Sequence, residues 1–568
     1  MVFLPSRAFC VEKIKQNWSS ALTVALISIP LSIALSIASG AGPLPGLITG
    51  IWGTLIGSIF IGSNYNIIGA AGALTTILFG ATLTAPLGLG VAVLPLLAIT
   101  SGFIILIIWI LKINKYLYYI PSSVMYGFAG GVAVLIATSQ IFDASGLSTL
   151  SRTGSFIGDI HQVILHHSDI HLPSLIVFGF FFGGILLWKK RNKKIPAVIP
   201  AVIIGILFGY GESKFFSSLD IISLYDKFGE IVVSVYLPLE GARLIEALSQ
   251  GDFLHWLFTL SGIIALISVL ETLITAKLGD KITKTESSSS KELFGLALAN
   301  IGSGFMGGLP ATGVFIRTGA NIKAGANHRT SGILASIFTG GITLVVLPFF
   351  SYLPMAVIAA VLVHTAIGLL EVEKFKDFWR HERTSFVIAI LVALITIFHD
   401  AGLGVAVGAV ASLFIFAERV SHGRFDIIWN YGDNTLYETR GNLYLRIPSP
   451  LPEVRVVTYS IAGNFSYIDA VRHAEHIKDL IHHPEVPALI IRLRDLFSID
   501  YEGVAVLDEL ITECEHFNTL IIVTSVAPHI AKELMSFPSF KTLHEKGYFT
   551  HKTRDALALL SLRGQKIN

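Results

Sequence analysis

The stretch Gly307-Gly-Leu-Pro-Ala-Thr-Gly-Val314 decides the fold, because it is a short run of small residues within an otherwise long apolar sequence. A similar run, Ile68-Gly-Ala-Ala-Gly-Ala-Leu-Thr-Thr76, occurs near the start of the chain. Paired short segments that Gly or Pro interrupts mark the binding site in membrane proteins built from inverted repeats. The alternative is that these glycines only allow helices to pack closely.

The composition around the two runs is that of a protein whose main solvent is lipid. Of 568 residues, 53% are hydrophobic and only 14% charged, and the mean hydropathy is +0.69. The net charge of +2 gives no basic surface for nucleic acid. The distribution of charge predicts a cytosolic N-terminal segment at 1–17, a transmembrane domain at 18–420, a linker at 421–450 and a soluble domain at 451–568.

The apolar segments can be counted, because a membrane-spanning helix needs about 20 mostly apolar residues. Twelve such segments and two shorter ones, near Gly69 and Thr312, predict fourteen spans in all. The twelve begin near Trp18, Pro45, Gly90, Ile120, Leu172, Pro196, His255, Lys291, Thr330, Leu353, Thr384 and Gly402.

The distribution of Lys and Arg orients these spans. With fourteen spans the basic clusters, such as Lys189 to Arg191 and Lys374 to Arg383, all fall on one side, which the positive-inside rule makes cytosolic. The loops on the other side contain only Arg152, Lys214, Lys227 and Arg243. We therefore expect an integral, multi-pass protein of a plasma or inner membrane, with both termini in the cytoplasm.

Each short segment is the third span of its half, which predicts a 7+7 inverted repeat. A half-helix that begins near mid-membrane directs free N–H groups and the positive end of its dipole at whatever lies before it. Two such ends that face each other form an anion site. Pro310 suits a helix start, and Thr312 can cap that helix or donate its hydroxyl.

Glu271 is the second candidate, since it lies well inside the eighth span, where a carboxylate is costly and usually functional. Thr275 follows one turn later on the same face, so the two can hold Na⁺ together with backbone carbonyls. Glu271 can instead carry a proton. In a third interpretation it is a structural carboxylate paired with Arg317.

The remaining polar residues indicate no catalytic or metal site. His161, His166, His167 and His171 share an external loop, but without Cys or acidic ligands at regular spacing they are expected to be solvated. Neither domain contains a nucleophile and base pair. We therefore expect a protein that is not an enzyme and that has no cofactor beyond a coupling Na⁺ or H⁺.

The longest distinctive stretch, from Leu293 through Gly307-Gly-Leu-Pro-Ala-Thr-Gly-Val314 to Asn321, resembles the sulfate permease (SulP) family of anion transporters. The first-span pattern Leu22-Thr-Val-Ala-Leu-Ile-Ser-Ile-Pro30 and the eighth-span Glu271 also match this family. The resemblance covers nearly the whole chain. Leu31, Leu35 and Ala38-Ser-Gly-Ala-Gly42 look more like the family's sodium-dependent bicarbonate transporters than its sulfate carriers.

The resemblance implies a core domain that moves the anion against a gate domain of spans five to seven and twelve to fourteen. It also implies a homodimer. Glu271 and Thr275 would serve the coupling cation. Apart from the resemblance, we expect Arg317 to be a structural charge. The anion site would be lined by Gly69, Ala70, Ala71, Gly72, Thr312, Gly313 and Val314.

The soluble domain alternates strands and amphipathic helices, which predicts a compact α/β fold. It is similar to the family's C-terminal STAS domain, which implies a possible cytosolic protein partner. Regulatory relatives have Ser after Asp in one turn, but this chain reads Asp500-Tyr-Glu-Gly503, which argues against a serine-phosphorylation switch there. The predicted elements are 454–460, 468–482, 488–494, 501–517, 520–525 and 530–536.

Three functional hypotheses follow. The first is a symporter of bicarbonate, sulfate or a dicarboxylate that Na⁺ or H⁺ drives by an elevator-like motion. The second is an uncoupled anion exchanger or channel. The third is a membrane-tethered signalling module, against which the missing phosphorylatable serine counts. A nucleobase permease would share the spans but not the soluble domain.

Overall fold

The computed structural model describes residues 7–113, 121–147, 150, 152–191, 195–215, 219–230, 246–247, 249–399, 401–420, 424–431, 436–441, 454–482 and 486–564. Arg243 and parts of the predicted linker lie outside these residues. The chain forms two compact units, Met1–Ser412 and Leu413–Asn568, and the boundary falls within the last apolar helix.

The first unit is helical, and each of the fourteen predicted segments contains a helix. Among the described residues, nine helical segments are long and apolar enough to cross a membrane. In chain order the helices that match the predictions are α1 (Arg7–Ala38), α2 (Pro43–Ile48) continued by α3 (Thr54–Phe60), α4 (Gly72–Thr84), α5 (Val93–Ile110), α6 (Ser122–Ala144), α8 (Leu172–Arg191), α9 (Val198–Phe215), α12 (Gly251–Thr283), α13 (Ser289–Phe305), α14 (Phe315–Lys323), α15 (Thr330–Phe350), α16 (Met355–Leu369), α18 (Arg383–Phe398) and α19 (Ala401–Val420).

Three further α-helices lie between the predicted spans in the described part of this unit: α7 (Phe156–Leu165), α10 (Leu224–Phe228) and α17 (Val372–His381). Helix α7, which occupies the loop that contains the four histidines, was not predicted. The segment 1–17 was predicted to be separate from the first span, whereas α1 begins at Arg7. Asn17 is buried and bonds Asn327, and these contacts continue the helix toward the N-terminus.

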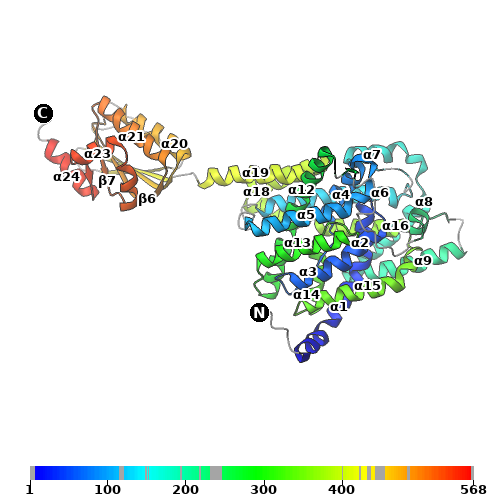
Figure 1. Cartoon of the computed structure of the whole chain (residues 1–568). Coiled ribbons are helices and arrows are strands. Elements are labelled where there is room, and N and C mark those ends of the chain that lie inside the picture. Colours follow the sequence, from blue (N-terminus) through cyan, green and yellow to red (C-terminus); the bar gives the residue numbers. More distant parts are fainter. Residues whose placement is uncertain are drawn as a thin grey trace. The chain divides into compact units, whose positions relative to one another are not determined.

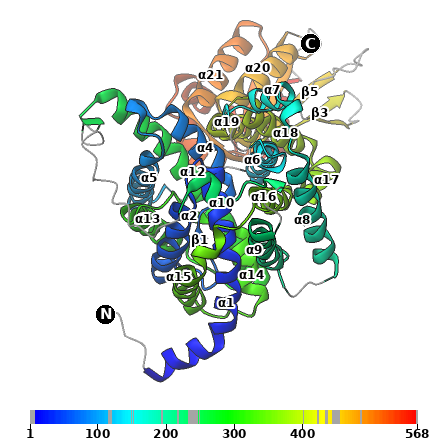
Figure 2. The ribbon, with the colours of Figure 1, turned by 90° about the vertical axis from the view of Figure 1, so that its right-hand side faces the viewer.

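The helices of this unit pack in two groups. In one, α5 runs along α12 and α13, α13 packs on α3, and α1 packs on α14 and α15. In the other, α6 lies against α16 and α18, and α16 also contacts α8 and α9. These groups correspond to the predicted core and gate, and Figures 1 and 2 show α13 beside α5 and α16 beside α6. Contacts between the groups include α4 with α6 and α1 with α16.

The second unit contains a mixed six-stranded sheet of order β4-β3-β5-β6-β7-β8. Strands β5 to β8 run parallel, whereas β3 pairs antiparallel with both β4 and β5. The strands are β3 (Arg424–Tyr431), β4 (Leu436–Gly441), β5 (Val454–Phe465), β6 (Ala488–Ile499), β7 (Leu520–Thr524) and β8 (Phe549–Thr550). The helices are α20 (Tyr467–Ile481), α21 (Tyr501–His516), α22 (Pro528–Leu534), α23 (Pro538–Glu545) and α24 (Thr553–Gly564).

Both faces of the sheet are covered, which explains its apolar strands. Leu489 and Ile491 of β6 belong to a core with α20 and α21, whereas Ala488 and Ile490 pack toward α24. The prediction of a linker at 421–450 is wrong, because β3 and β4 lie within these residues and belong to the sheet. The available signal was the alternation of apolar residues in β3, where Phe425, Ile427 and Trp429 are buried.

Candidate anion-binding site

The two glycine-rich runs meet in the interior of the first unit. Two short strands, β1 (Ile68–Gly69) and β2 (Thr312–Gly313), pair antiparallel, with Ile68 opposite Gly313 and Gly69 opposite Thr312. The Val314 amide extends the pair by donating to the Ile67 carbonyl at 2.8 Å. Equivalent positions of the two halves are therefore in direct contact, as an inverted repeat requires.

A half-helix follows each strand. Helix α4 begins at Gly72 after the N-cap Ala71, and α14 begins at Phe315 after the N-cap Val314; neither cap makes a side-chain hydrogen bond. The first N–H groups of each helix consequently have no intrahelical partner and present partial positive charge. The expectation that a helix starts at Pro310 with Thr312 as its cap is wrong, because 312–313 is a strand and the helix begins later.

The backbone of the two short strands and of the residues that follow them is buried and lies close to neighbouring side chains. Ala70, Ala71, Thr312 and Val314 are all buried. A Cβ at Gly69 would lie 2.2 Å from Nη1 of Arg317, so the strand approaches the guanidinium more closely than any side chain permits. Thr312 Oγ1 has no hydrogen-bond partner among the described residues.

Arg317 lies in the first turn of α14 and is fully buried. Its Nη2 donates to Ser32 Oγ of α1 at 2.9 Å, whereas Nε and Nη1 have no partner in the part of the chain that the structure describes. No ion pair joins Arg317 to Glu271 there. An unpaired buried cation is costly, and an anion would remove this cost. Arg317 was predicted from the sequence only as a structural charge.

Glu271 and Thr275 project from α12 toward the same strand pair. Thr275 Oγ1 donates to the Gly313 carbonyl at 3.0 Å, and the Gly313 amide donates to Thr272 Oγ1 at 2.8 Å. The Thr312 hydroxyl faces the Glu271 carboxyl, whereas Oε2 of Glu271 is buried and forms no hydrogen bond with any residue that the structure describes. Thr275 thus retains acceptor capacity for a cation, although its proton is engaged by the backbone.

Two further polar residues, Thr272 and Asn66, contact β2 and were not predicted as site residues. The Asn66 side chain contacts Gly313, since a Cβ there would lie 2.9 Å from its Oδ1. Thr272 follows Glu271 directly in the eighth span, and Asn66 lies two residues before the first glycine-rich run. A polar residue in or beside an apolar run was the available signal in both cases.

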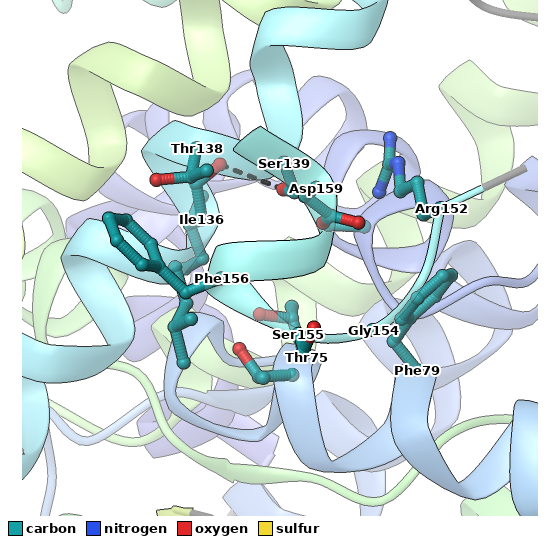
Figure 3. Close-up of a pocket in the computed structure, with 13 residues that line it drawn as sticks. Thr75, Phe79, Ile136, Thr138, Ser139, Arg152, Gly154, Ser155, Phe156 and Asp159 are labelled. Atoms are coloured by element: carbon teal, nitrogen blue, oxygen red, sulfur yellow. Dashed lines mark hydrogen bonds between the residues drawn. The ribbon is translucent and has the colours of Figure 1, made fainter. Parts of the chain in front are cut away.

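A small cavity of about 30 Å³ lies farther along α4, between α4 and α6. Figure 3 shows Thr75 and Phe79 of α4 on one side, Thr138 and Ser139 of α6 on another, and a loop that runs from Arg152 to Phe156. Arg152 closes this end by lying 5.7 Å from the Phe79 ring centroid and 2.9 Å from the Asp143 carboxylate. Thr75 and Phe79, which line this cavity, lie in the half-helix α4 that begins at Gly72.

The model of the sulfate permease family matches residues 14–392, which include both half-helices, α12 and most of the gate group. The chain belongs to the sulfate permease family. It is therefore a multi-pass membrane protein of a transporter family and not an enzyme, as the sequence predicts. The resemblance that the sequence indicated is confirmed.

Individual relatives support this membership over the whole chain. The putative sulfate transporter YvdB of Bacillus subtilis is 26% identical over 551 residues, which cover 96% of this chain and 98% of the relative. The bicarbonate transporter BicA of Picosynechococcus is 25% identical over 415 residues, which cover 71% of this chain and 70% of the relative.

Solved structures show the same fold. The structure of the murine Solute Carrier 26 family member A9 anion transporter in the inward-facing state matches 98% of this chain and 95% of that chain, with a TM-score of 0.78 and 16% identity. The transmembrane domain of a cyanobacterial bicarbonate transporter BicA matches 71% of this chain and 97% of that chain, with a TM-score of 0.61 and 21% identity.

Proposed function

We propose that this chain is a secondary active transporter of a small anion across the plasma or inner membrane, coupled to Na⁺ or H⁺. The observation that carries the proposal is the pair of uncapped half-helix N-termini beside the buried Arg317 guanidinium, which has two nitrogens without partners. Bicarbonate and sulfate are the first candidates, because relatives of both names align over most of the chain. A small dicarboxylate is a further candidate.

The anion would be bound by backbone N–H groups at Gly72 and Phe315, with the small residues of the two runs around it. Such groups suit an oxyanion without selecting strongly among them. Arg317 adds a full positive charge and a planar fork of donors that matches carboxylate and sulfate oxygens. The lining would be Gly69, Ala70, Ala71, Gly72, Thr312, Gly313 and Val314.

Coupling would depend on Glu271 and Thr275. Oε2 of Glu271 is buried without a hydrogen bond to the described part of the chain, which supports a bound cation or proton there, because a carboxylate inside the membrane is costly. Both residues approach β2, so an occupied cation site would also position one half of the anion site. Simultaneous binding of cation and anion is the basis of symport.

Transport would proceed by an elevator-like motion of the core group against the gate group. The helices that form the site support this motion, since α12 and α14 belong to the core group and α4 contacts α1, α5 and α12 of that group as well as α6 of the gate group. A rigid core would therefore carry the bound anion as it moves. The loop at Arg152 and Phe79 would close the outer side in the conformation described here.

An uncoupled anion exchanger or channel is the second candidate. The hydrogen bond from Thr275 to the Gly313 carbonyl favours this second candidate, because the bond gives Thr275 a structural role that needs no cation. The proposal also places both termini in the cytoplasm, takes the second unit as a STAS domain that binds a cytosolic protein, and assumes a homodimer.

Uptake of radiolabelled sulfate, bicarbonate and fumarate into proteoliposomes under imposed Na⁺ or pH gradients tests the proposal. Glu271→Gln is compared with wild type and with Glu373→Gln, whose carboxylate is 85% exposed on α17. Gradient-dependent uptake of one anion that only Glu271→Gln abolishes would support symport. Exchange that needs no gradient and survives Glu271→Gln would favour the second candidate, and absence of any uptake by wild type would refute both.

A further inference from the structure

A second buried carboxylate, Glu292, lies in the first turn of α13 and takes no part in the coupling scheme above. Its side chain is completely buried. Oε1 accepts a hydrogen bond from the Ser63 amide at 2.5 Å, and Oε2 accepts one from Asn66 Nδ2 at 3.0 Å. Among the described residues no Lys, Arg or His forms a salt bridge with it. Glu292 is therefore held by neutral donors of the loop before β1.

Asn66 connects Glu292 to the residues around the strand pair by hydrogen bonds. Its Oδ1 accepts from Thr318 Oγ1 of α14 at 3.2 Å, and the Thr318 hydroxyl in turn accepts from the Ile67 amide at 3.0 Å. Its Nδ2 lies also 3.4 Å from the Thr272 carbonyl. Glu292 thus fixes which way the Asn66 amide points, because a carboxylate can only accept and must face Nδ2.

The oriented amide lies directly against β2. A Cβ on Gly313 would be 2.9 Å from Oδ1 and 3.0 Å from Nδ2 of Asn66. The Gly313 amide donates to Thr272 Oγ1 of α12, so Gly313 is held by α12 and packs against the Asn66 side chain. A rotation of the Asn66 amide would break the bond to Thr318, which lies in the half-helix α14.

We propose that Glu292 is a positioning residue for the anion site: through Asn66 it sets the spacing of the strand pair and hence of the N-termini of α4 and α14. This inference rests on the proposed anion transport. In this role Glu292 affects the affinity for the anion through its hydrogen bonds, and a negative charge at position 292 is not required.

A reciprocal exchange separates hydrogen bonding from charge. Glu292→Gln places an amide against the Asn66 amide, so one hydrogen bond is lost. Asn66→Asp alone places two carboxylates in contact. The double variant, Asn66→Asp with Glu292→Gln, restores the bond between positions 66 and 292 with donor and acceptor exchanged, and an acceptor remains for Thr318 and for the Ser63 amide; it loses only the long 3.4 Å bond to the Thr272 carbonyl, as does Asn66→Asp alone. Glu286→Gln, an exposed carboxylate in the loop before α13, is the matched control.

The full-length variants are compared by initial rates of radiolabelled sulfate and bicarbonate uptake in proteoliposomes, with thermal unfolding as a check on folding. We expect Glu292→Gln to raise KM for the transported anion roughly tenfold, at a maximal rate within about twofold of wild type. The double variant should return KM to within about threefold of wild type. Glu286→Gln should not differ from wild type.

Two results would overturn the inference. One is a wild-type KM in Glu292→Gln. The other is a folded double variant whose KM stays raised or whose pH profile is displaced, since that would assign the effect to the charge at Glu292. If the wild-type protein takes up none of sulfate, bicarbonate and fumarate, the proposed function itself fails. That result is distinguishable from a failure of the inference because it appears without any substitution.

Discussion

Replacing Gly69 by Ala tests the position of the buried guanidinium. The added Cβ would lie 2.2 Å from Arg317 Nη1 and 3.2 Å from its Cζ, which is closer than nonbonded atoms approach, so the guanidinium must move. Moving it stretches the 2.9 Å bond from Nη2 to Ser32 Oγ. A hydrogen bond to a charged group contributes about 1.5–3 kcal/mol, and overpacking costs about 1–3 kcal/mol.

The same displacement should weaken anion binding. If the guanidinium contributes about 1.5–3 kcal/mol to the bound anion, its loss raises the dissociation constant by roughly 10- to 150-fold. The assay is KM of sulfate or bicarbonate uptake in proteoliposomes, together with the midpoint of thermal unfolding in detergent. Both should change in Gly69→Ala.

Gly340→Ala is the matched control, because its Cβ would meet only Ile51, at 3.8 Å, which is ordinary van der Waals contact. This variant should keep the wild-type KM and stability. A Gly69→Ala protein with unchanged KM and unfolding midpoint would refute the argument, since the guanidinium would then not lie against Gly69 or would not serve the anion.

Three further predictions concern other parts of the chain. Asp143→Asn removes the negative charge and one of the two carboxylate oxygens that accept from Arg152 at 2.9 Å and from Lys227 at 2.7 Å, so thermal unfolding should show a loss of about 3 kcal/mol; an unchanged midpoint would contradict a buried ion-pair cluster. In the second unit, burial lowers the pKa of His473 to about 3, so the unfolded chain binds a proton that the folded unit does not. Stability of that unit should therefore fall as pH falls from about 6.5 toward 3, by up to about 1.4 kcal/mol per pH unit, and hydrogen exchange of β5 in the full chain should lose this dependence in His473→Gln. Burial also raises the pKa of Cys514 to about 12, so iodoacetamide should label its peptide only after denaturation; rapid labelling of the folded protein, measured by mass spectrometry, would refute its burial.

The sequence predicted the elements of the fold well where the buried residues form a run or a regular alternation along the chain. Every apolar run it identified contains a helix, and the basic loops required both short segments to be counted. In the second unit the strands β5, β6 and β7 and the helices α20 and α21 lie where alternation placed them. It missed β3 and β4, because they pair antiparallel ahead of the regular alternation of strand and helix.

The candidate site was predicted in part. The paired glycine-rich runs identified both half-helices, since short interrupted segments are visible in any apolar sequence. The start of α14 was placed too early, because the sequence does not show that Thr312 and Gly313 form a strand with the other half. The proposed pairing of Glu271 with Arg317 is absent from the described residues, where Arg317 bonds Ser32 instead.

The sequence by itself determined that this is a membrane protein of two similar halves with a soluble α/β domain, because hydropathy, charge bias and internal repetition are properties of the chain alone. Only the tertiary structure decided which polar groups meet. Asn66, Thr272, Glu292 and Arg317 come from separate segments, and their contacts depend on the packing of whole helices around the strand pair. A buried polar side chain takes its role from the partners that packing provides, and sequence spacing does not specify those partners.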